Sequence, residues 1–249
     1  MSAAASSREL KSSYIVKGHA RSELTGVVEQ TTRIRRLALC GEMAAIYHIT
    51  HFENLASIVD FGSLCCDRIN ESNKLAKQEI GYQHIKERRK ARKVPVGPKG
   101  VLADYVPFYF ATKSPMLYTI NHGNVPGYMG GQAPIVHLVS DTDVVVARGG
   151  EFLFTDGHAE MAISEFFADL EDLIHLDWQV MSSRMWNDTV EDGDRMRRRQ
   201  AEFLVHTMFP WEWVSEIGVI NQDMADDVAK VLAKATSVPP INVHRDWYY

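Results

Sequence analysis

The pattern of apolar and polar residues predicts a strand followed by a capped helix near residue 46. The run 46–49 (Ile-Tyr-His-Ile) has the composition of a short strand, and the spacing of Thr50 and Glu53 after it is typical of a helix capping box. An apolar stripe at helical spacing follows, formed by Leu55, Ile58 and Val59. Gly62 is placed to end that helix in the left-handed conformation.

Later apolar runs predict further strands and helices. Strands are expected over residues 105–110, 134–139, 144–147 and 217–220. Pro107 places the first of these at a sheet edge or an irregular start, because proline cannot donate to a strand ladder. Ser114-Pro115 predicts a helix N-terminus, and a C-terminal helix has one apolar face formed by Met224, Val228, Val231 and Leu232. Short strands mixed with helices and long polar segments indicate an α+β fold.

The N-terminal part of the chain differs from the rest. Residues 1–43 are polar, with scattered serine and arginine, and we expect them to form a partly helical or flexible extension to one domain over residues 44–249. No run is apolar enough for a signal peptide or a membrane span. We therefore expect a soluble, cytoplasmic protein without a membrane partner.

Two segments of opposite charge lie within a mildly acidic chain. The 249 residues carry a formal net charge of -5, which excludes histone-like coating of duplex DNA. Residues 84–100 hold seven Lys and Arg against one Glu, whereas residues 151–194 hold twelve Asp and Glu against one Arg. Any role with nucleic acid must therefore depend on local patches.

Sequence motifs exclude several function classes. The chain has no Walker loop, no G-x-G-x-x-G, no G-x-S-x-G and no H-E-x-x-H, which argues against P-loop, Rossmann, hydrolase and zinc-protease chemistry. Its three cysteines form no C-x-x-C pair, and no histidine cluster has the spacing of metal ligands, so we expect neither a disulfide framework nor a metal site.

Three residues near the first predicted strand are candidates for ligand contacts. His48 and Thr50 lie on the same strand face, and Ser57 follows Thr50 by two helical turns, so all three can line one wall. As a ligand site, they would bind a ribose or an amide of a small molecule. The alternative is a core histidine beside a capping threonine.

Arg89 and Glu202 are candidates for charge chemistry. Arg89 lies in the basic segment, where a guanidinium suits a pyrophosphate or a nucleic-acid backbone, although a solvated helix face is the ordinary alternative. Glu202 follows an arginine cluster and precedes an apolar run, so its carboxylate enters the core layer. If Glu202 is catalytic, its carboxylate stabilises positive charge on a sugar ring. The alternative is that Glu202 is a structural residue in an ion pair.

Four separated blocks, in order, closely resemble the DarT family of DNA ADP-ribosyltransferase toxins. They are Tyr47-His48-Ile49-Thr50-His51-Phe52-Glu53-Asn54-Leu55, residues 102–110 with Ser114-Pro115-Met116-Leu117, Phe154-Thr155-Asp156-Gly157-His158, and Arg198-Arg199-Gln200-Ala201-Glu202. The similarity extends from about residue 44 to the C-terminus. It implies a PARP-like ADP-ribosyltransferase fold with split mixed sheets around an NAD cleft.

The resemblance also implies a reaction and its residues. NAD is cleaved at the nicotinamide-ribose bond, and ADP-ribose is transferred to thymidine in a short sequence motif of single-stranded DNA. Glu202 and Arg89 match the catalytic residues, and His48, Ile49 and Thr50 match the NAD-binding strand. Ser57 and Cys65 resemble further NAD contacts. Residues of about 70–89 match a loop over NAD, and about 155–202 match a loop that presents DNA.

Further candidates concern the residues that contact DNA and the partner protein. Candidates for base or backbone contacts are Tyr105, Tyr109, His158, Arg88, Arg92 and Arg197 to Arg199. The family implies a DarG-like antitoxin, a macrodomain hydrolase that removes the modification. Guanosine in DNA, RNA or protein stays open as the acceptor, as does a non-catalytic module that binds NAD or nucleic acid.

Overall fold

The computed structural model describes residues 44–249, which belong to one compact unit. The extension predicted over residues 1–43 lies outside the described residues. The strands are β1 Ala45–His51, β2 Ser63–Cys65, β3 Tyr105–Tyr109, β4 Ile135–Asp141, β5 Phe152–Thr155, β6 Phe166–Phe167, β7 Glu202–His206, β8 Met208–Pro210, β9 Glu216–Val219 and β10 Ile241–Val243. The α-helices are α2 Leu55–Phe61, α3 Asp67–Asn73, α4 Gln83–Ala91, α5 Pro115–Asn121, α6 Thr142–Ala147, α7 Trp178–Ser182, α8 Arg195–Arg198 and α9 Gln222–Val231. Short 3-10 helices are η1 Phe52–Asn54, η2 Leu102–Asp104, η3 Leu170–His175, η4 Trp211–Trp213 and η5 Arg245–Trp247.

An eight-stranded mixed sheet organises the described residues, with the order β10-β9-β4-β1-β3-β7-β5-β6. Its strands pair antiparallel except β10 with β9. β1 pairs with β4 along its whole length but meets β3 only at Tyr47 and Tyr109, so the sheet is nearly split between these two strands. A separate pair joins β2 to β8. This α+β fold with a split mixed sheet confirms the fold class predicted from the sequence.

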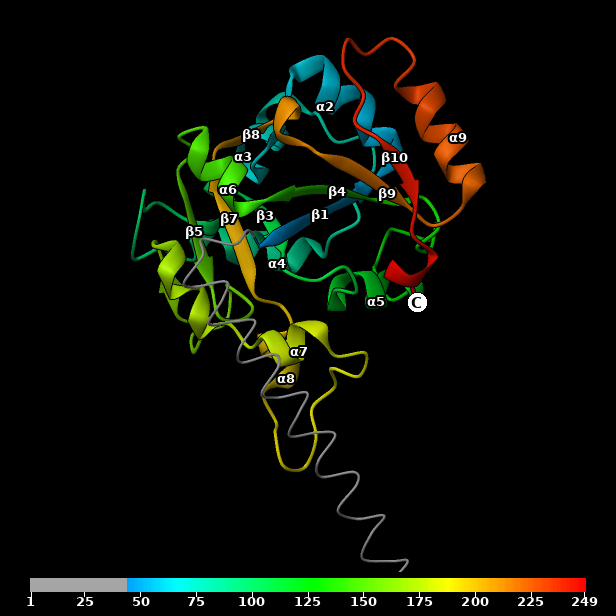
Figure 1. Cartoon of the computed structure of the whole chain (residues 1–249). Coiled ribbons are helices and arrows are strands. Elements are labelled where there is room, and N and C mark those ends of the chain that lie inside the picture. The colour runs from blue at the N-terminus through cyan, green and yellow to red at the C-terminus, as the bar shows by residue number, and fades with distance from the viewer. Residues whose placement is uncertain (1–43) are drawn as a thin grey trace, which may run out of the picture. The chain divides into compact units, whose positions relative to one another are not determined.

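The two faces of β1 belong to different core clusters. Ile46 packs in a cluster with Leu55 of α2 and Val228 of α9, whereas Ile49 packs with Leu117 of α5 on the other face. Figure 1 accordingly shows α2 and α9 on one side of this half of the sheet and α5 on the other. Alternation along the strand places His48 and Thr50 on the face of Ile46.

The helix after β1 begins differently from the prediction. The strand continues to His51, and the His51 ring, not Thr50, accepts the capping hydrogen bond, from the N–H of Glu53 over 3.3 Å. Thr50 Oγ1 instead accepts from Asn54 Nδ2 over 3.1 Å. The predicted Gly62 cap is confirmed, since its φ is 81°.

Other predicted elements have mixed outcomes. The strands near 134–139 and 217–220 and the Ser114 cap are confirmed, whereas residues 144–147 lie in α6 and not in a strand. Asp141 caps that helix by accepting from the N–H of Val144, which outweighs the β propensity of three consecutive valines.

Pro107 lies inside the sheet and not at its edge. Its carbonyl accepts from His48 Nδ1 over 2.8 Å across the gap between β1 and β3. Because its backbone polar groups face the gap, the missing N–H breaks no bond of the β3–β7 ladder.

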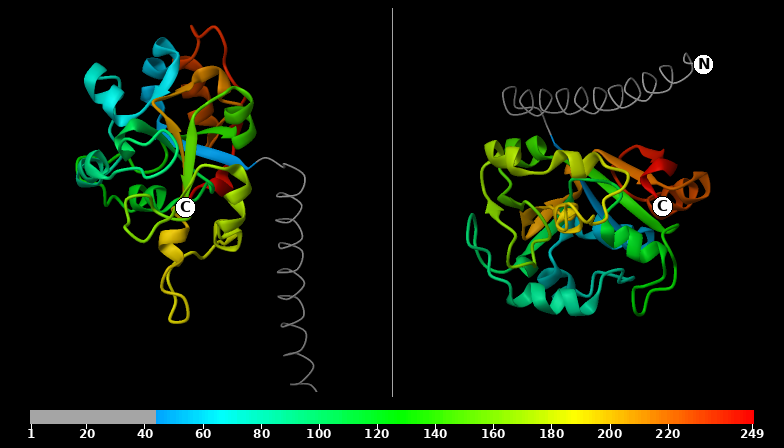
Figure 2. Two further views of the ribbon diagram at one scale, coloured as in Figure 1. Left: turned by 90° about the vertical axis from the view of Figure 1, so that its left-hand side faces the viewer. Right: turned by 90° about the horizontal axis from the view of Figure 1, so that it is seen from below.

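In Figure 1 and the left view of Figure 2, α7 and α8 extend away from the sheet beside the start of β7. Among the described residues, no helix has the length and apolar character needed to cross a membrane.

Candidate active site

Three strand ends bring the candidate catalytic residues together. Glu202 is the first residue of β7, Tyr109 is the last of β3 and lies opposite it, and Thr155 is the last of β5. The Glu202 N–H donates to Thr155 Oγ1 over 3.2 Å, and the Thr155 hydroxyl donates to the Gly157 carbonyl over 2.6 Å. The backbone of Glu202 is therefore held where the split in the sheet opens.

Both carboxylate oxygens of Glu202 have donors. Arg89 Nη1 from α4 lies 2.8 Å from Oε2, and the N–H of Ala159 donates to Oε1 over 3.0 Å. Arg89 and Glu202 are 7% and 4% exposed, so their charges interact with little screening. Burial acts to lower the pKa of the Arg89 guanidinium, but the charges of Glu202, Asp67 and Tyr109 and the hydrogen bond to Glu202 together raise it. Arg89 Nη2 is buried without a protein partner, which leaves one donor for a ligand.

A pocket lies next to β1, and Arg89 and Glu202 are not among its lining residues. The Asp67 carboxylate acts on both Arg89 and the pocket residue His48, so the pair and the pocket belong to one region of the structure. Four of the residues predicted to bind NAD line the pocket, namely His48, Thr50, Ser57 and Cys65. Asn54, Asn70, Leu75 and Ala76 complete much of the wall. The structure therefore brings together four predicted residues from three elements, β1, α2 and β2.

The protonation states of two pocket residues follow from their partners. Burial lowers the pKa of His48, so its ring is neutral. Because a carbonyl only accepts, the Pro107 contact places the proton on Nδ1 and leaves Nε2 as an acceptor. Burial raises the pKa of the Cys65 thiol to about 11, which excludes a thiolate at neutral pH.

Ile49 differs from its neighbours in β1. It is 6% exposed and its side chain packs in the cluster on the opposite face of the sheet from His48. Only its backbone can therefore contribute to the pocket.

Asn54 is a residue that sequence reasoning missed. Its Nδ2 donates to Thr50 Oγ1 and to the Gln78 carbonyl, and its Oδ1 accepts from the N–H groups of Lys77 and Gln78 over 2.8 and 2.9 Å. This buried amide thereby fixes residues 74–82, here called the 74–82 segment, against the pocket wall. No local pattern could have found this role, because Lys77 and Gln78 lie 23 and 24 residues further along the chain.

Three predicted DNA contacts remain partly accessible, namely Tyr109, His158 and Arg92. The charge of Glu202 acts on the first two of them. Burial first, and then the Glu202 carboxylate, raise the pKa of Tyr109, so its phenol is neutral. Burial lowers the pKa of His158, and its Nδ1 accepts from the N–H of Glu160, which leaves Nε2–H as a donor.

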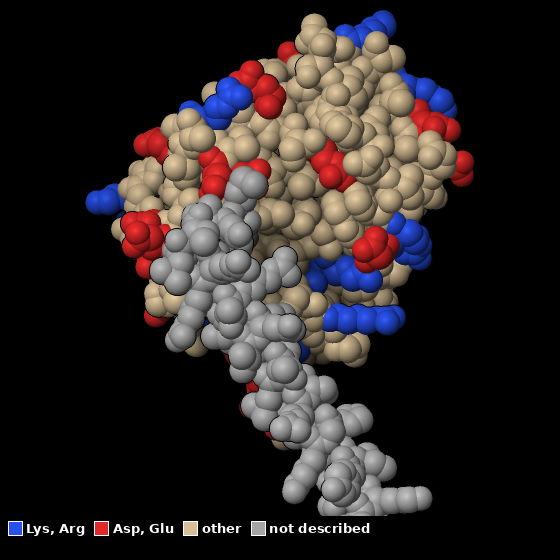
Figure 3. Space-filling view, in the orientation of Figure 1, with Lys and Arg blue, Asp and Glu red and all other residues tan. Residues whose placement is uncertain are grey.

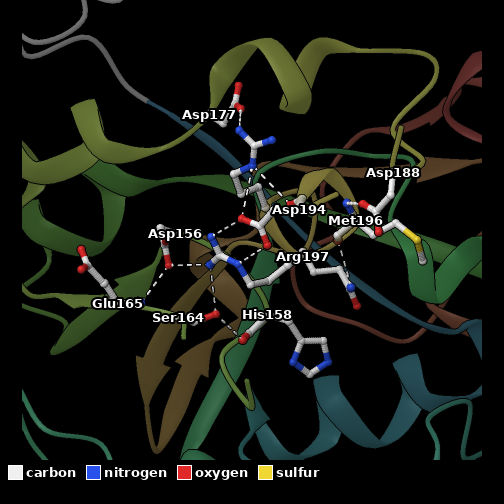
Figure 4. A network of polar contacts seen from close by, with 12 residues as sticks. Asp156, His158, Ser164, Glu165, Asp177, Asp188, Asp194, Met196 and Arg197 are labelled. Atoms are coloured by element: carbon white, nitrogen blue, oxygen red, sulfur yellow. Dashed lines mark hydrogen bonds and ion pairs between the residues drawn. The ribbon is translucent and has the colours of Figure 1, made fainter. Parts of the chain in front are cut away.

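Three other predicted DNA contacts are corrected by the structure. Tyr105 is fully buried and its hydroxyl donates to the Lys99 carbonyl, so no ring face is available for a base. The Arg199 guanidinium is 4% exposed and donates to carbonyl oxygens of Lys113, Val180, Met181 and Ser183. Arg197 is 8% exposed and binds Asp194, Asp156 and Ser164 (Figure 4).

Ion pairs neutralise part of the charge of both segments. Arg88 pairs with Glu160 over 2.9 Å and Arg89 with Glu202, so the basic helix α4 contacts the acidic part of the chain. Arg198 pairs with Asp177 and Asp192 within that part. On the face in Figure 3, Lys and Arg side chains lie among Asp and Glu side chains. The net charge of each segment therefore overstates the field that a strand of DNA would meet.

No group of His, Cys, Asp and Glu that could hold a metal ion occurs among residues 44–249. The chemistry of the described site is that of an ion pair, neutral hydroxyl and imidazole groups, and backbone donors.

Comparison with known proteins relates this site to a family. The model of the family described as "ssDNA thymidine ADP-ribosyltransferase, DarT" matches residues 47–249. The structure of Thermus sp. 2.9 DarT in complex with ADP-ribosylated ssDNA superposes with a TM-score of 0.78 at 42% identity, covering 83% of this chain and 96% of that one. The same protein in complex with NAD+ gives 0.74 at 40% identity, covering 83% and 98%.

A more distant relative joins two activities in one chain. A Thermosipho africanus protein described as a DNA ADP-ribosyl transferase-DNA ADP-ribosyl glycohydrolase fusion is 23% identical over 75% of this chain and 45% of its own length. The family model covers most of the chain, and the Thermus relative exceeds 40% identity over nearly its whole length. The chain therefore belongs to the DarT family of single-stranded DNA thymidine ADP-ribosyltransferases.

Proposed function

We propose that this protein transfers ADP-ribose from NAD to thymidine in single-stranded DNA, in a sequence-specific manner, as the toxin of a toxin-antitoxin pair. Membership of the DarT family supports the reaction class. The observation that carries the assignment to this site is the buried Arg89–Glu202 pair together with the pocket lined by His48, Thr50, Ser57 and Cys65. The charge of Asp67 acts on both Arg89 and His48, which supports placing the pair and the pocket in one site.

NAD is bound in that pocket. His48 Nε2 accepts from a ribose hydroxyl or the carboxamide, the backbone of β1 at Ile49 and Thr50 pairs with the nicotinamide end, and Ser57 and Cys65 form the facing wall. The unpartnered Arg89 Nη2 supports the same arrangement, because a buried donor without a partner is costly unless a ligand satisfies it.

Glu202 stabilises the sugar during bond cleavage. When the glycosidic bond breaks, its electron pair leaves with nicotinamide and the ribose acquires positive charge. A carboxylate held from both sides by Arg89 and Ala159 faces that charge without having to reorient.

The thymine ring nitrogen then attacks the anomeric carbon and loses its proton. The balanced reaction consumes NAD and thymidine and yields ADP-ribosylated thymidine, nicotinamide and one proton. A guanidinium is effectively always protonated, so Arg89 stabilises the developing imide anion, and Glu202 or water accepts the proton.

A single strand is the substrate because its bases are already unpaired and easily unstacked. Tyr109 and His158, on which the charge of Glu202 acts, contact the target nucleotide. Arg92, which is partly accessible, contacts its phosphate. The long 155–202 segment presents the strand, and residues of about 70–89, which comprise the end of α3, the 74–82 segment and most of α4, cover NAD.

The partner is a DarG-like macrodomain hydrolase that reverses the modification. The fusion of a transferase to a glycohydrolase in the Thermosipho relative supports this pairing. Both substrates are found in the bacterial cytoplasm, which is where we place the protein, with residues 1–43 as an extension and residues 44–249 as the catalytic domain.

Mass spectrometry of oligonucleotides incubated with the full chain and NAD tests the proposal. We expect a mass increase of one ADP-ribose on single strands that contain thymine and none on matched strands without thymine. Modification that persists without thymine would overturn the thymidine assignment in favour of guanosine. Release of no nicotinamide with any DNA, RNA or protein acceptor would leave only a binding module.

A further inference from the structure

One buried guanidinium joins the two ends of the 155–202 segment (Figure 4). Arg197 Nε and Nη2 donate to the two carboxylate oxygens of Asp194 over 2.7 and 2.8 Å. Its Nη1 donates to Asp156 Oδ1 over 3.0 Å and to Ser164 Oγ over 3.2 Å. Asp156 lies near the start of the segment and Asp194 near its end, so Arg197 closes the segment into a loop of defined shape.

The same contacts fix the turn that contains His158. The His158 N–H donates to the Arg197 carbonyl over 3.0 Å, and Ser164 Oγ donates to the His158 carbonyl over 2.7 Å. Figure 4 shows the imidazole pointing away from this network, so the network holds the backbone of His158 and not its ring. Both backbone polar groups of His158 are thus held by Arg197 or by a residue that Arg197 binds.

The turn that contains His158 also orients the Glu202 carboxylate. Ala159 follows His158, and its N–H is the donor to Glu202 Oε1. A shift of the turn would remove that donor and leave Glu202 held only by Arg89. The contacts therefore form a continuous path from Arg197 through residues 157–159 to Glu202.

Gly157 shows how tightly this path is packed. A Cβ at this position would lie 2.3 Å from Arg197 Nη1 and 2.9 Å from its Cγ, closer than nonbonded atoms can approach. The φ of Gly157 is outside the left-handed region. Glycine is therefore required at this position because the Arg197 side chain occupies the space of a Cβ, and not because of the backbone conformation.

We propose that Arg197 is a positioning residue for ADP-ribose transfer, which acts through the Ala159 N–H on Glu202 and holds His158 at the acceptor side of the site. The inference rests on the proposed function. Four polar contacts occupy Arg197 and it is nearly inaccessible, so its role differs from the phosphate contact that an arginine cluster ordinarily indicates.

The test uses Arg197→Lys and Gly157→Ala in the full chain, with Arg195→Lys as the matched control. Lysine keeps the charge but loses the planar fork that binds Asp194, whereas Gly157→Ala displaces the guanidinium without removing any polar group. Arg195 lies two residues away, and its guanidinium donates to Ser183, Met185 and Asn187, none of which Arg197 binds.

Transfer to a thymine-containing single strand, the affinity for that strand without NAD, NAD-binding stoichiometry and melting temperature are measured for each variant. We expect kcat to fall roughly 10- to 100-fold in both test variants, as for a small misplacement of a catalytic group, while KM for NAD and the DNA affinity stay within about threefold. Full NAD stoichiometry would exclude a smaller folded fraction as the cause. Arg195→Lys should match wild type.

Two results would overturn the inference. One is an unchanged kcat in Gly157→Ala, which also decides the question if Arg197→Lys does not fold. The other is a loss of DNA affinity that parallels the loss of activity, together with a DNA affinity that depends on salt concentration less steeply than that of the wild type. This result would make Arg197 a phosphate contact. Absence of transfer by the wild-type chain would instead overturn the proposed function itself.

Discussion

Arg89 Nη1 lies 2.8 Å from Glu202 Oε2, and both side chains are buried although they are 113 residues apart in the sequence. Removing one member of a buried ion pair leaves the other charge uncompensated. The pair therefore links stability to the chemistry proposed for the site. For variants at these two positions, both the melting temperature and the transfer activity must be measured.

We expect Glu202→Gln to lower transfer to DNA by roughly 10²- to 10³-fold, as loss of one preorganised charge-stabilising group does in other enzymes. The amide keeps the shape of the side chain, so NAD affinity should change little. Nicotinamide release and calorimetric NAD binding check this expectation. Glu212→Gln, on the exposed helix η4, is the control and should behave as wild type. Activity near the wild-type level in Glu202→Gln would make this residue structural.

We expect Arg89→Lys to lower kcat by roughly 10²-fold, because a lysine can pair with Glu202 but cannot supply the second nitrogen that lies unpartnered in the site. Steady-state kinetics with thymine-containing single strands measures the effect. If the lysine variant kept full activity while Glu202→Gln lost it, charge alone would suffice at position 89. Melting curves should show a larger loss of stability for Arg89→Ala than for Arg89→Lys, because the alanine leaves Glu202 buried and unpaired.

We expect Asn54→Ala to raise KM for NAD roughly tenfold, equivalent to about 1.4 kcal/mol, with kcat changed less than about twofold. The substitution removes the three hydrogen bonds that hold the 74–82 segment against the pocket, and also the bond from Asn54 to Thr50. Trypsin should also cut faster at Lys74 and Lys77, which lie in that segment. Asn54→Asp should be intermediate, since its carboxylate still accepts from two backbone N–H groups but cannot donate to Gln78.

The exposed amide Asn242 in β10 provides the control for this experiment. Asn242→Ala should leave both KM and the cleavage pattern unchanged. Equal cleavage of Asn54→Ala and wild type would show that other contacts suffice to hold the segment.

We expect the free energy of unfolding to decrease below about pH 6.5 because His137 is buried and neutral. Burial lowers its pKa to about 4 from 6.5, so the unfolded chain binds the proton first and stability is lost as the pH falls between these values. The loss from pH 7 to pH 5 should be about 2 kcal/mol for this residue, and the lowered pKa of His48 adds a loss of the same sign.

Denaturant unfolding at several pH values measures this dependence. His137→Gln should flatten the curve, whereas His122→Gln, at an exposed position, should leave its slope unchanged. A wild-type curve that is flat from pH 7 to pH 5 would contradict the prediction.

The sequence by itself determined the elements whose signals are local. The strand at His48, the cap at Gly62, the N-terminus of α5 at Ser114 and the apolar face of α9 depend on neighbouring residues, so their patterns predict them correctly. The four blocks shared with the DarT family also identified the reaction class, because they retain residue types and order.

Only the tertiary structure decided which charges meet. Arg89, Arg197 and Arg199 all belong to basic clusters, yet one pairs with Glu202, one closes the 155–202 segment and one binds backbone carbonyls. Sequence patterns report the charge of a side chain but not its burial or its distant partners, and these are set by contacts between residues far apart in the chain. For the same reason the helix at 142–147 and the role of Asn54 became visible only once their tertiary partners were in place.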